Sequence, residues 1–153
     1  MLPPAGLEVM PANLPHDHHV ARYVPYQRTR RDEDDNVLGI LAEAFRLRPG
    51  EQGLSVTWIE HFPGEWNEQL QAAVAAIRRT QKTGQKSAFA WGLVGRIHQA
   101  CAAKGHRVRI IHVPEAQNGG HSEIRQLPHD DYLLLEMLAT EAFTEFRLNS
   151  QIP

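Results

Sequence analysis

The stretch Leu54-Ser-Val-Thr-Trp58, with the segment Glu65 to Thr80 that follows it, decides the fold class. In the first stretch, apolar residues alternate with Ser55 and Thr57, which predicts a strand with one apolar and one polar face. The second segment has an alanine-rich middle of high helix propensity, acidic residues at its start and two arginines at its end, as a helix dipole favours. A strand followed by a helix predicts a sheet with helices packed against it.

The remaining segments extend this pattern. Further strands are predicted at residues 20–24, 87–91, 107–113 and 122–127, and further helices at 37–46, 93–104 and 130–146. The turn Asn118-Gly119-Gly120 predicts that the last two strands pair antiparallel, and the polar run Arg28 to Asn36 predicts an exposed loop. We expect an α/β or α+β fold in which about three to four helices cover a single mixed sheet of about five strands.

Length and composition predict one α/β domain over residues 16–153, preceded by a flexible proline-rich arm over residues 1–15. The chain has 153 residues, of which 42% are hydrophobic, and it contains neither a signal-peptide pattern nor an apolar run long enough for a membrane span. Its one cysteine, Cys101, excludes an intrachain disulfide, so a reducing cytoplasm is the expected compartment.

The formal net charge of -2 hides a strong asymmetry along the chain. Residues 69–114 contain eight basic and no acidic residues, whereas the rest contains eight basic and eighteen acidic residues. If these basic side chains gather on one face, they attract an anionic partner such as RNA, DNA, a nucleotide or an acidic protein. The alternative is that they pair with acidic residues of the same chain, although exposed ion pairs contribute only about 0–1 kcal/mol each.

The sequence His16-Asp17-His18-His19 is the densest cluster of metal-ligating side chains. In an extended chain His16 and His18 share one face, so His16, His18 and His19 are candidate zinc ligands, with His112 or His121 completing the site. The alternative is a solvated polar segment before the first strand. We expect no organic cofactor.

Two histidines are candidate proton carriers. His121 follows the predicted turn and could act as general acid or base, oriented by Glu123 on the same strand face. His19 is the second candidate, either as a proton carrier or as a metal ligand. The alternative for His121 is a turn histidine in water or one bonded to a backbone carbonyl.

Arginine forks match phosphate oxygens in two-point geometry, so arginines near these histidines are candidate ligand-binding residues. The full set of candidate ligand-binding residues is Arg22, Arg28, Arg30, Arg31, Arg78, Arg79, Lys82, Arg107 and Arg109. The four acidic residues Asp32 to Asp35 follow directly after Arg31 and favour the alternative of a solvated loop whose charges compensate each other.

The segments His18-His-Val-Ala-Arg-Tyr-Val24, Glu43-Ala-Phe45 and Leu54-Ser-Val-Thr-Trp-Ile-Glu60 resemble a set of small bacterial proteins with no assigned activity. The resemblance implies a bacterial or phage-like origin and a self-contained domain. It supplies no catalytic residues.

The sequence therefore predicts a small soluble module that binds a phosphate-bearing partner, nucleic acid or nucleotide, through its basic residues. If the protein is an enzyme, the expected reaction is phosphoryl or glycosyl transfer or hydrolysis with His121 and His19 as proton carriers. Two alternatives stay open: a non-catalytic interaction subunit of a toxin–antitoxin or defence complex, and a zinc-dependent hydrolase.

Overall fold

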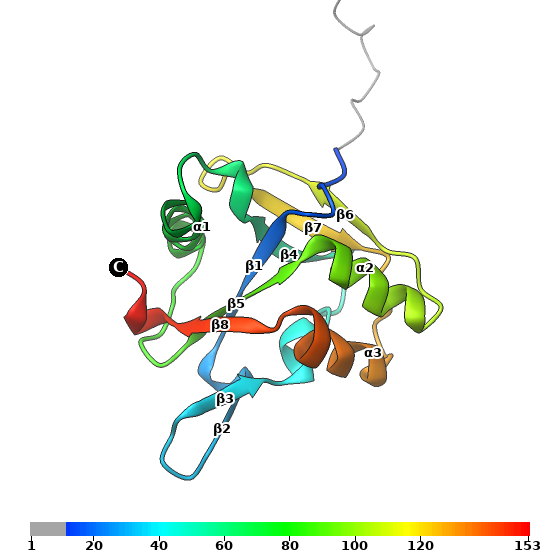
Figure 1. The fold of residues 1–153 in the computed structure, drawn as a ribbon. Helices are drawn as coiled ribbons and strands as arrows, with labels where there is room; N and C mark the ends of the chain where they lie inside the picture. Colours follow the sequence, from blue (N-terminus) through cyan, green and yellow to red (C-terminus); the bar gives the residue numbers. More distant parts are fainter. Residues whose placement is uncertain (1–11) are drawn as a thin grey trace, which may run out of the picture.

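The computed structural model describes residues 12–153 as a sheet with helices on both faces (Figure 1). The strands of the main sheet are β1 (His19–Val24), β4 (Gly53–Trp58), β5 (Ala88–Leu93), β6 (Arg109–His112), β7 (His121–Arg125) and β8 (Glu145–Leu148). A separate hairpin is formed by β2 (Thr29–Arg31) and β3 (Val37–Ile40). The helices are α1 (Trp66–Thr80), α2 (Val94–Ala103) and α3 (Tyr132–Met137).

The main sheet has the strand order β6-β7-β4-β1-β5-β8, and every neighbouring pair is antiparallel. The expected α+β class is confirmed, but the sheet has six strands and is antiparallel throughout, where about five in a mixed sheet were predicted. β4 and β5 both run antiparallel to β1, so they are parallel to each other and lie on either side of it. The crossover that connects them contains α1.

Each face of the sheet has its own apolar core. On one face α1 packs through Leu70, Val74 and Ile77 against residues of β1 and β5 such as Ala21 and Phe89. On the other face α2, α3 and the short helical turn Ala42–Phe45 cover a larger core. Figure 1 shows α1 on one side of the sheet and α2 and α3 on the other.

Residues 28–46 differ from the prediction of a loop followed by a helix. They form the β2–β3 hairpin, which projects from the body of the protein in Figure 1, and then the short turn Ala42–Phe45. The acidic run makes the hairpin turn: Asp32 accepts hydrogen bonds from the backbone of Asp34 and Asn36, and Asp35 has a φ of 64°. The apolar spacing of residues 37–46 was compatible with a helix, but strand pairing prevails over this local preference.

The last predicted helix, residues 130–146, is shorter in the structure. After α3 the chain makes one π-helical segment, Leu138–Ala142, turns at Phe143, and forms the edge strand β8. Ala142 lies directly over Gly92, where an added Cβ atom would be 2.4 Å from the Ala142 carbonyl oxygen. Gly92 therefore allows the end of this helix to approach β5 closely.

The described part of the predicted N-terminal arm lies against β6. Asn13 forms an isolated bridge with Ile111, and Leu14 is 3% exposed. The rest of that predicted arm lies outside the described residues. Across residues 12–153, no helix combines the length and apolar character needed to cross a membrane.

We predict that Gly92→Ala destabilises the protein by about 1–3 kcal/mol, since the new methyl group overlaps a backbone carbonyl that cannot move freely. Urea unfolding measures the change. Gly84→Ala is the matched control, because the nearest atom to its new Cβ is 4.0 Å away, and we expect its effect to stay within about 0.5 kcal/mol. Equal stability of the two variants would contradict the close approach at Gly92.

Candidate functional site

A cleft of about 760 Å³ is lined from both faces of the sheet, by the end of α1 on one side and by the segment that contains Glu43 and Arg48 on the other. Its floor includes Ser55 and Thr57 of β4 and His121 of β7. The end of α1 contributes Ile77 and Thr80 to its wall. Because the α1 core contacts mainly β1 and β5, Ser55 on β4 stays exposed to the cleft, whereas Thr57 is 2% exposed and accepts a hydrogen bond from Asn118.

The cleft lies where β1 and β4 separate. Only two residue pairs join these strands, Val20 with Trp58 and Ala21 with Thr57. Arg22 lies beyond the last pair, and its guanidinium donates from Nη1 to the Ser55 carbonyl at 2.7 Å and from Nε to the Ala44 carbonyl at 2.6 Å. The side chain of Arg22 thus takes the place of backbone hydrogen bonds that the separated strands cannot make.

Burial lowers the pKa of Arg22 to about 10, while the negative charge of Glu51 acts in the opposite direction. The guanidinium therefore remains charged at neutral pH. It is a permanent cation beside the cleft floor.

Basic side chains outnumber acidic ones around the cleft. The lining residues include five cations, Arg22, Arg28, Arg46, Arg48 and Lys82, and three carboxylates, Glu43, Glu51 and Glu115, a net charge of +2 with His121 neutral. Glu43 accepts from Arg46 at 2.9 Å and lies 3.5 Å from Arg28. Within residues 12–153, the side chains of Arg48 and Lys82 make no ion pair or hydrogen bond, so these two cations are available to a ligand.

Of the two histidines predicted as proton carriers, His121 lies in this cleft. Its Nδ1 is 2.8 Å from the Val113 carbonyl, and its Nε2 is 3.3 Å from Ser55 Oγ and 3.4 Å from Glu115 Oε1. Glu123, which was expected to orient it, instead accepts from Arg125 at 3.0 Å. The backbone carbonyl therefore takes the orienting role predicted for Glu123.

His19 lies elsewhere. His19 lies on β1 and His121 on β7, and β4 lies between these two strands. The spacing between strands in a sheet therefore places the two histidines at least about 10 Å apart. Both oxygens of Glu60 bind His19: one accepts from its backbone N–H at 2.7 Å and the other contacts Nδ1 at 2.6 Å. His19 pairs with Leu93 of β5, but β4 ends at Trp58, so this carboxylate replaces the missing partner of His19 on the β4 side. His19 lines a smaller hollow of about 190 Å³ with Arg96.

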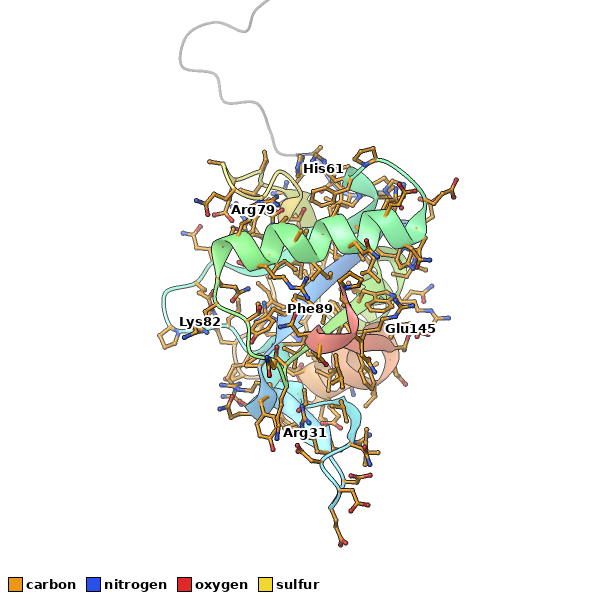
Figure 2. The ribbon with its side chains drawn as sticks, turned by 90° about the vertical axis from the view of Figure 1, so that its left-hand side faces the viewer. Arg31, His61, Arg79, Lys82, Phe89 and Glu145 are labelled. Carbon is orange, nitrogen blue, oxygen red and sulfur yellow. The ribbon has the colours of Figure 1, made fainter. Side chains whose placement is uncertain are left out.

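The candidate phosphate-binding arginines Arg22, Arg28, Arg30 and Arg31 are divided between two places. Arg22 and Arg28 line the cleft, whereas Arg30 and Arg31 belong to the β2–β3 hairpin. Arg31 donates to Thr29 Oγ1 and to the Asp35 and Lys86 carbonyls, and its guanidinium lies 4.3 Å from the centre of the Tyr26 ring. Arg31 therefore fixes the turn end of the hairpin and links it to Lys86, and Figure 2 shows it far from Arg79 and His61.

Two arginines at the end of α1 hold neighbouring segments. Arg78 makes five hydrogen bonds to residues 149–153, and Arg79 donates to the Gln117 carbonyl at 3.0 Å. Lys82 follows α1 and reaches the cleft, on the side of the molecule where Figure 2 shows Arg79 as well.

The eight basic residues of the central block do not form one face. Arg78 and Arg79 end α1, whereas Lys104 follows α2 on the opposite face of the sheet, and Arg109 lies on β6. Among them only Lys86 pairs with a carboxylate in the described structure, Asp35 at 3.1 Å. The expectation of a single basic face is therefore wrong: α1 and α2 pack on opposite faces and separate the charges. Arg107 lies just before β6, and like Arg109 it does not line the cleft.

The candidate zinc ligands have different neighbours. The ring of His16 stacks on His98 at 4.6 Å, His18 accepts from Trp58 Nε1 at 2.9 Å, and His19 contacts Glu60. Over residues 12–153 there is no group of three or more His, Cys, Asp or Glu side chains placed to hold a metal ion.

Several cleft residues were not singled out from the sequence. They are Ser55, Arg46, Arg48, Glu51 and Glu115. For Ser55 a signal was present, because the alternation of β4 gives this central strand a polar face. The two arginines carry no such signal, since they lie in an irregular segment that only the tertiary structure brings to the cleft.

Comparisons of the chain with protein-family models, with curated proteins and with solved structures found no match. The geometry of the site is therefore the only basis for a functional proposal.

Two pairs of neighbouring histidine rings, His16 with His98 and His61 with His112, make stability depend on pH. Burial lowers the pKa of His98 below its usual 6.5, and the positive charge of His16 adds to the effect; His61 is lowered in the same way by burial and by His112. The unfolded chain therefore binds more protons than the folded chain as pH falls from 6.5 through these lowered pKa values. We predict that folding stability decreases over this window.

Urea midpoints at neutral and mildly acidic pH measure this loss. His98→Gln should reduce the loss, because a neutral amide takes no proton, whereas His129→Gln, at an exposed position, should leave it unchanged. An equal pH dependence in wild type and His98→Gln would contradict the assignment.

Proposed function

We propose that the protein binds a small phosphate-bearing ligand of nucleotide size in the cleft. The observation that carries the proposal is that Arg48 and Lys82, which line a polar cleft of about 760 Å³, make no side-chain ion pair or hydrogen bond within residues 12–153. This volume is in the range typical of small-molecule sites. Arginine and lysine side chains stabilise phosphate by charge-assisted hydrogen bonds.

The rest of the lining suits the non-phosphate part of a nucleotide. Tyr23 and Pro25 are partly exposed in the cleft lining and offer apolar surface for a base, and the exposed Ser55 offers a hydroxyl nearby. Binding of a long nucleic acid is less favoured, since the basic residues outside the cleft lie on both faces of the sheet instead of following one track.

A second candidate function, a protein-interaction subunit, is supported by exposed apolar side chains in two places. Leu38 of β3 is 54% exposed, and Tyr132 and Leu133 at the start of α3 are 53% and 63% exposed. Such side chains contribute to protein contacts when a partner covers them. A polypeptide that copurifies in fixed ratio, together with an empty cleft, would favour this candidate.

The test is calorimetric titration of the full chain with inorganic phosphate, pyrophosphate, nucleoside mono- and diphosphates and a short oligonucleotide. We predict that at least one nucleotide binds and that the double change Arg48→Gln, Lys82→Gln weakens it by about tenfold or more. Each charge-assisted hydrogen bond contributes about 1.5–3 kcal/mol, and 1.4 kcal/mol is a tenfold change in affinity.

The control removes the same charge outside the cleft. The control is the double variant Lys104→Gln, Arg107→Gln, whose changes lie at the end of α2 and just before β6. We expect this variant to change the affinity less than about twofold, because it acts only through long-range electrostatics. Equal weakening by both double variants would indicate a general charge effect. That result, or the failure of every phosphate compound to bind, would overturn the proposal.

A further inference from the structure

A serine and a histidine meet on the floor of the cleft. Ser55 lies opposite Glu123 and His121 opposite Thr57 in the β4–β7 ladder, so the two are diagonal neighbours on one face. His121 Nε2 is 3.3 Å from Ser55 Oγ, the distance of a long hydrogen bond between a nucleophile and a base. Both line the cleft with Arg48 and Lys82.

The hydrogen bonds of His121 determine which ring nitrogen faces the serine as a base. Nδ1 lies 2.8 Å from the Val113 carbonyl, and a carbonyl oxygen only accepts, so Nδ1 carries the proton. Nε2 then presents its lone pair to the Ser55 hydroxyl. The His121 side chain is 12% exposed, which holds the ring in this orientation.

After His121 takes a proton its ring carries a positive charge, and the negative charge of the Glu115 carboxylate lies close to it. Its Oε1 is 3.4 Å from His121 Nε2 and stabilises the imidazolium once it forms. The arrangement differs from a catalytic triad, in which the carboxylate contacts the other ring nitrogen: Glu115 and Ser55 lie near the same Nε2, and the Val113 carbonyl is the group that orients the ring.

Neighbouring contacts hold the backbone on both sides of this pair. Arg22 donates to the Ser55 carbonyl at 2.7 Å, and Asn118 donates to Thr57 Oγ1 at 2.9 Å, which ties the 113–121 loop to β4. Arg79 binds the same loop through the Gln117 carbonyl. These residues position the pair without facing the reacting atoms.

We propose that Ser55 is a nucleophile and His121 its general base in the hydrolysis of phosphate monoesters bound in the cleft; the substrate class rests on the proposed function. Ser55 Oγ forms a bond to phosphorus while its proton moves to His121 Nε2. The ester P–O bond breaks, and the imidazolium returns that proton to the departing alcohol.

A second step restores the enzyme. Water attacks the phosphoserine, giving one proton to His121 Nε2; the bond between phosphorus and Ser55 Oγ breaks, and Oγ recovers the proton as inorganic phosphate leaves. Arg48 and Lys82 offset the negative charge on the phosphoryl oxygens in both steps. No redox change and no co-reactant other than water is needed.

The first test is covalent labelling of the full chain with diisopropyl fluorophosphate, in which Ser55 displaces fluoride. We expect one label on the peptide that contains Ser55, no label on that peptide in Ser55→Ala, and labelling slowed at least about 100-fold in His121→Gln, since a general base contributes about 10² to 10⁴. His112→Gln is the matched control: His112 also contacts a carbonyl, that of Gly119, but lies outside the cleft.

Unfolding midpoints confirm that each variant is folded, and Ser55→Cys keeps a nucleophile at the site if Ser55→Ala is unstable. No label on Ser55, or labelling that His121→Gln leaves unchanged, overturns the nucleophile and base assignment even if nucleotides bind.

The substrate class has its own test. Hydrolysis of 4-nitrophenyl phosphate that Ser55→Ala abolishes supports the proposal, whereas hydrolysis of 4-nitrophenyl acetate alone overturns the assignment to phosphate esters. If Ser55 is labelled but no phosphate compound binds in calorimetry, the proposed function is wrong, while the assignment of Ser55 as nucleophile and His121 as base still holds. The two claims can therefore fail separately.

Discussion

The insertion of Arg22 between β1 and β4 is the constraint on which the site depends. Two strands in the centre of a sheet normally pair along their length, because each unpaired backbone group buried away from water is costly. Here they separate after two residue pairs, and the guanidinium of Arg22 binds the carbonyls of Ser55 and Ala44. The separation opens the floor of the cleft and at the same time fixes the backbone of Ser55.

The uneven cover of the sheet completes the site. On the α2 and α3 face, apolar residues of several strands are buried together. On the α1 face the helix covers β1 and β5, so Thr57 and His121 of the neighbouring strands meet the 113–121 loop and the cleft instead of an apolar core. Thr57 is buried on a central strand without an unpaired polar atom, because Asn118 of that loop donates a hydrogen bond to its Oγ1.

Local patterns in the sequence were sufficient for the elements with strong periodicity. Three elements occur close to their predicted positions: the strand at Leu54 to Trp58, the helix at Glu65 to Thr80, and the antiparallel pair β6 and β7. The hairpin at residues 29–40 and the edge strand β8 were missed, since each is stabilised by pairing or packing with residues distant in sequence.

The site was predictable in part. His121, Arg22, Arg28 and Lys82 were singled out from the sequence and line one cleft. The pairing of His121 with Ser55 was not foreseen, because it requires the β4–β7 register, and the expected single basic face failed because α1 and α2 cover opposite faces. Charge counted along a chain does not show on which side of a sheet each side chain lies.

The most direct measurement of the central claim is a map of backbone amide shifts in ¹H–¹⁵N spectra during titration with a nucleoside diphosphate. The account predicts saturable shifts centred on Ser55, Thr57, Lys82 and His121, with little change around Lys104 and Arg107. Shifts centred on the end of α2 or on β6, or no saturable shift at all, would contradict it.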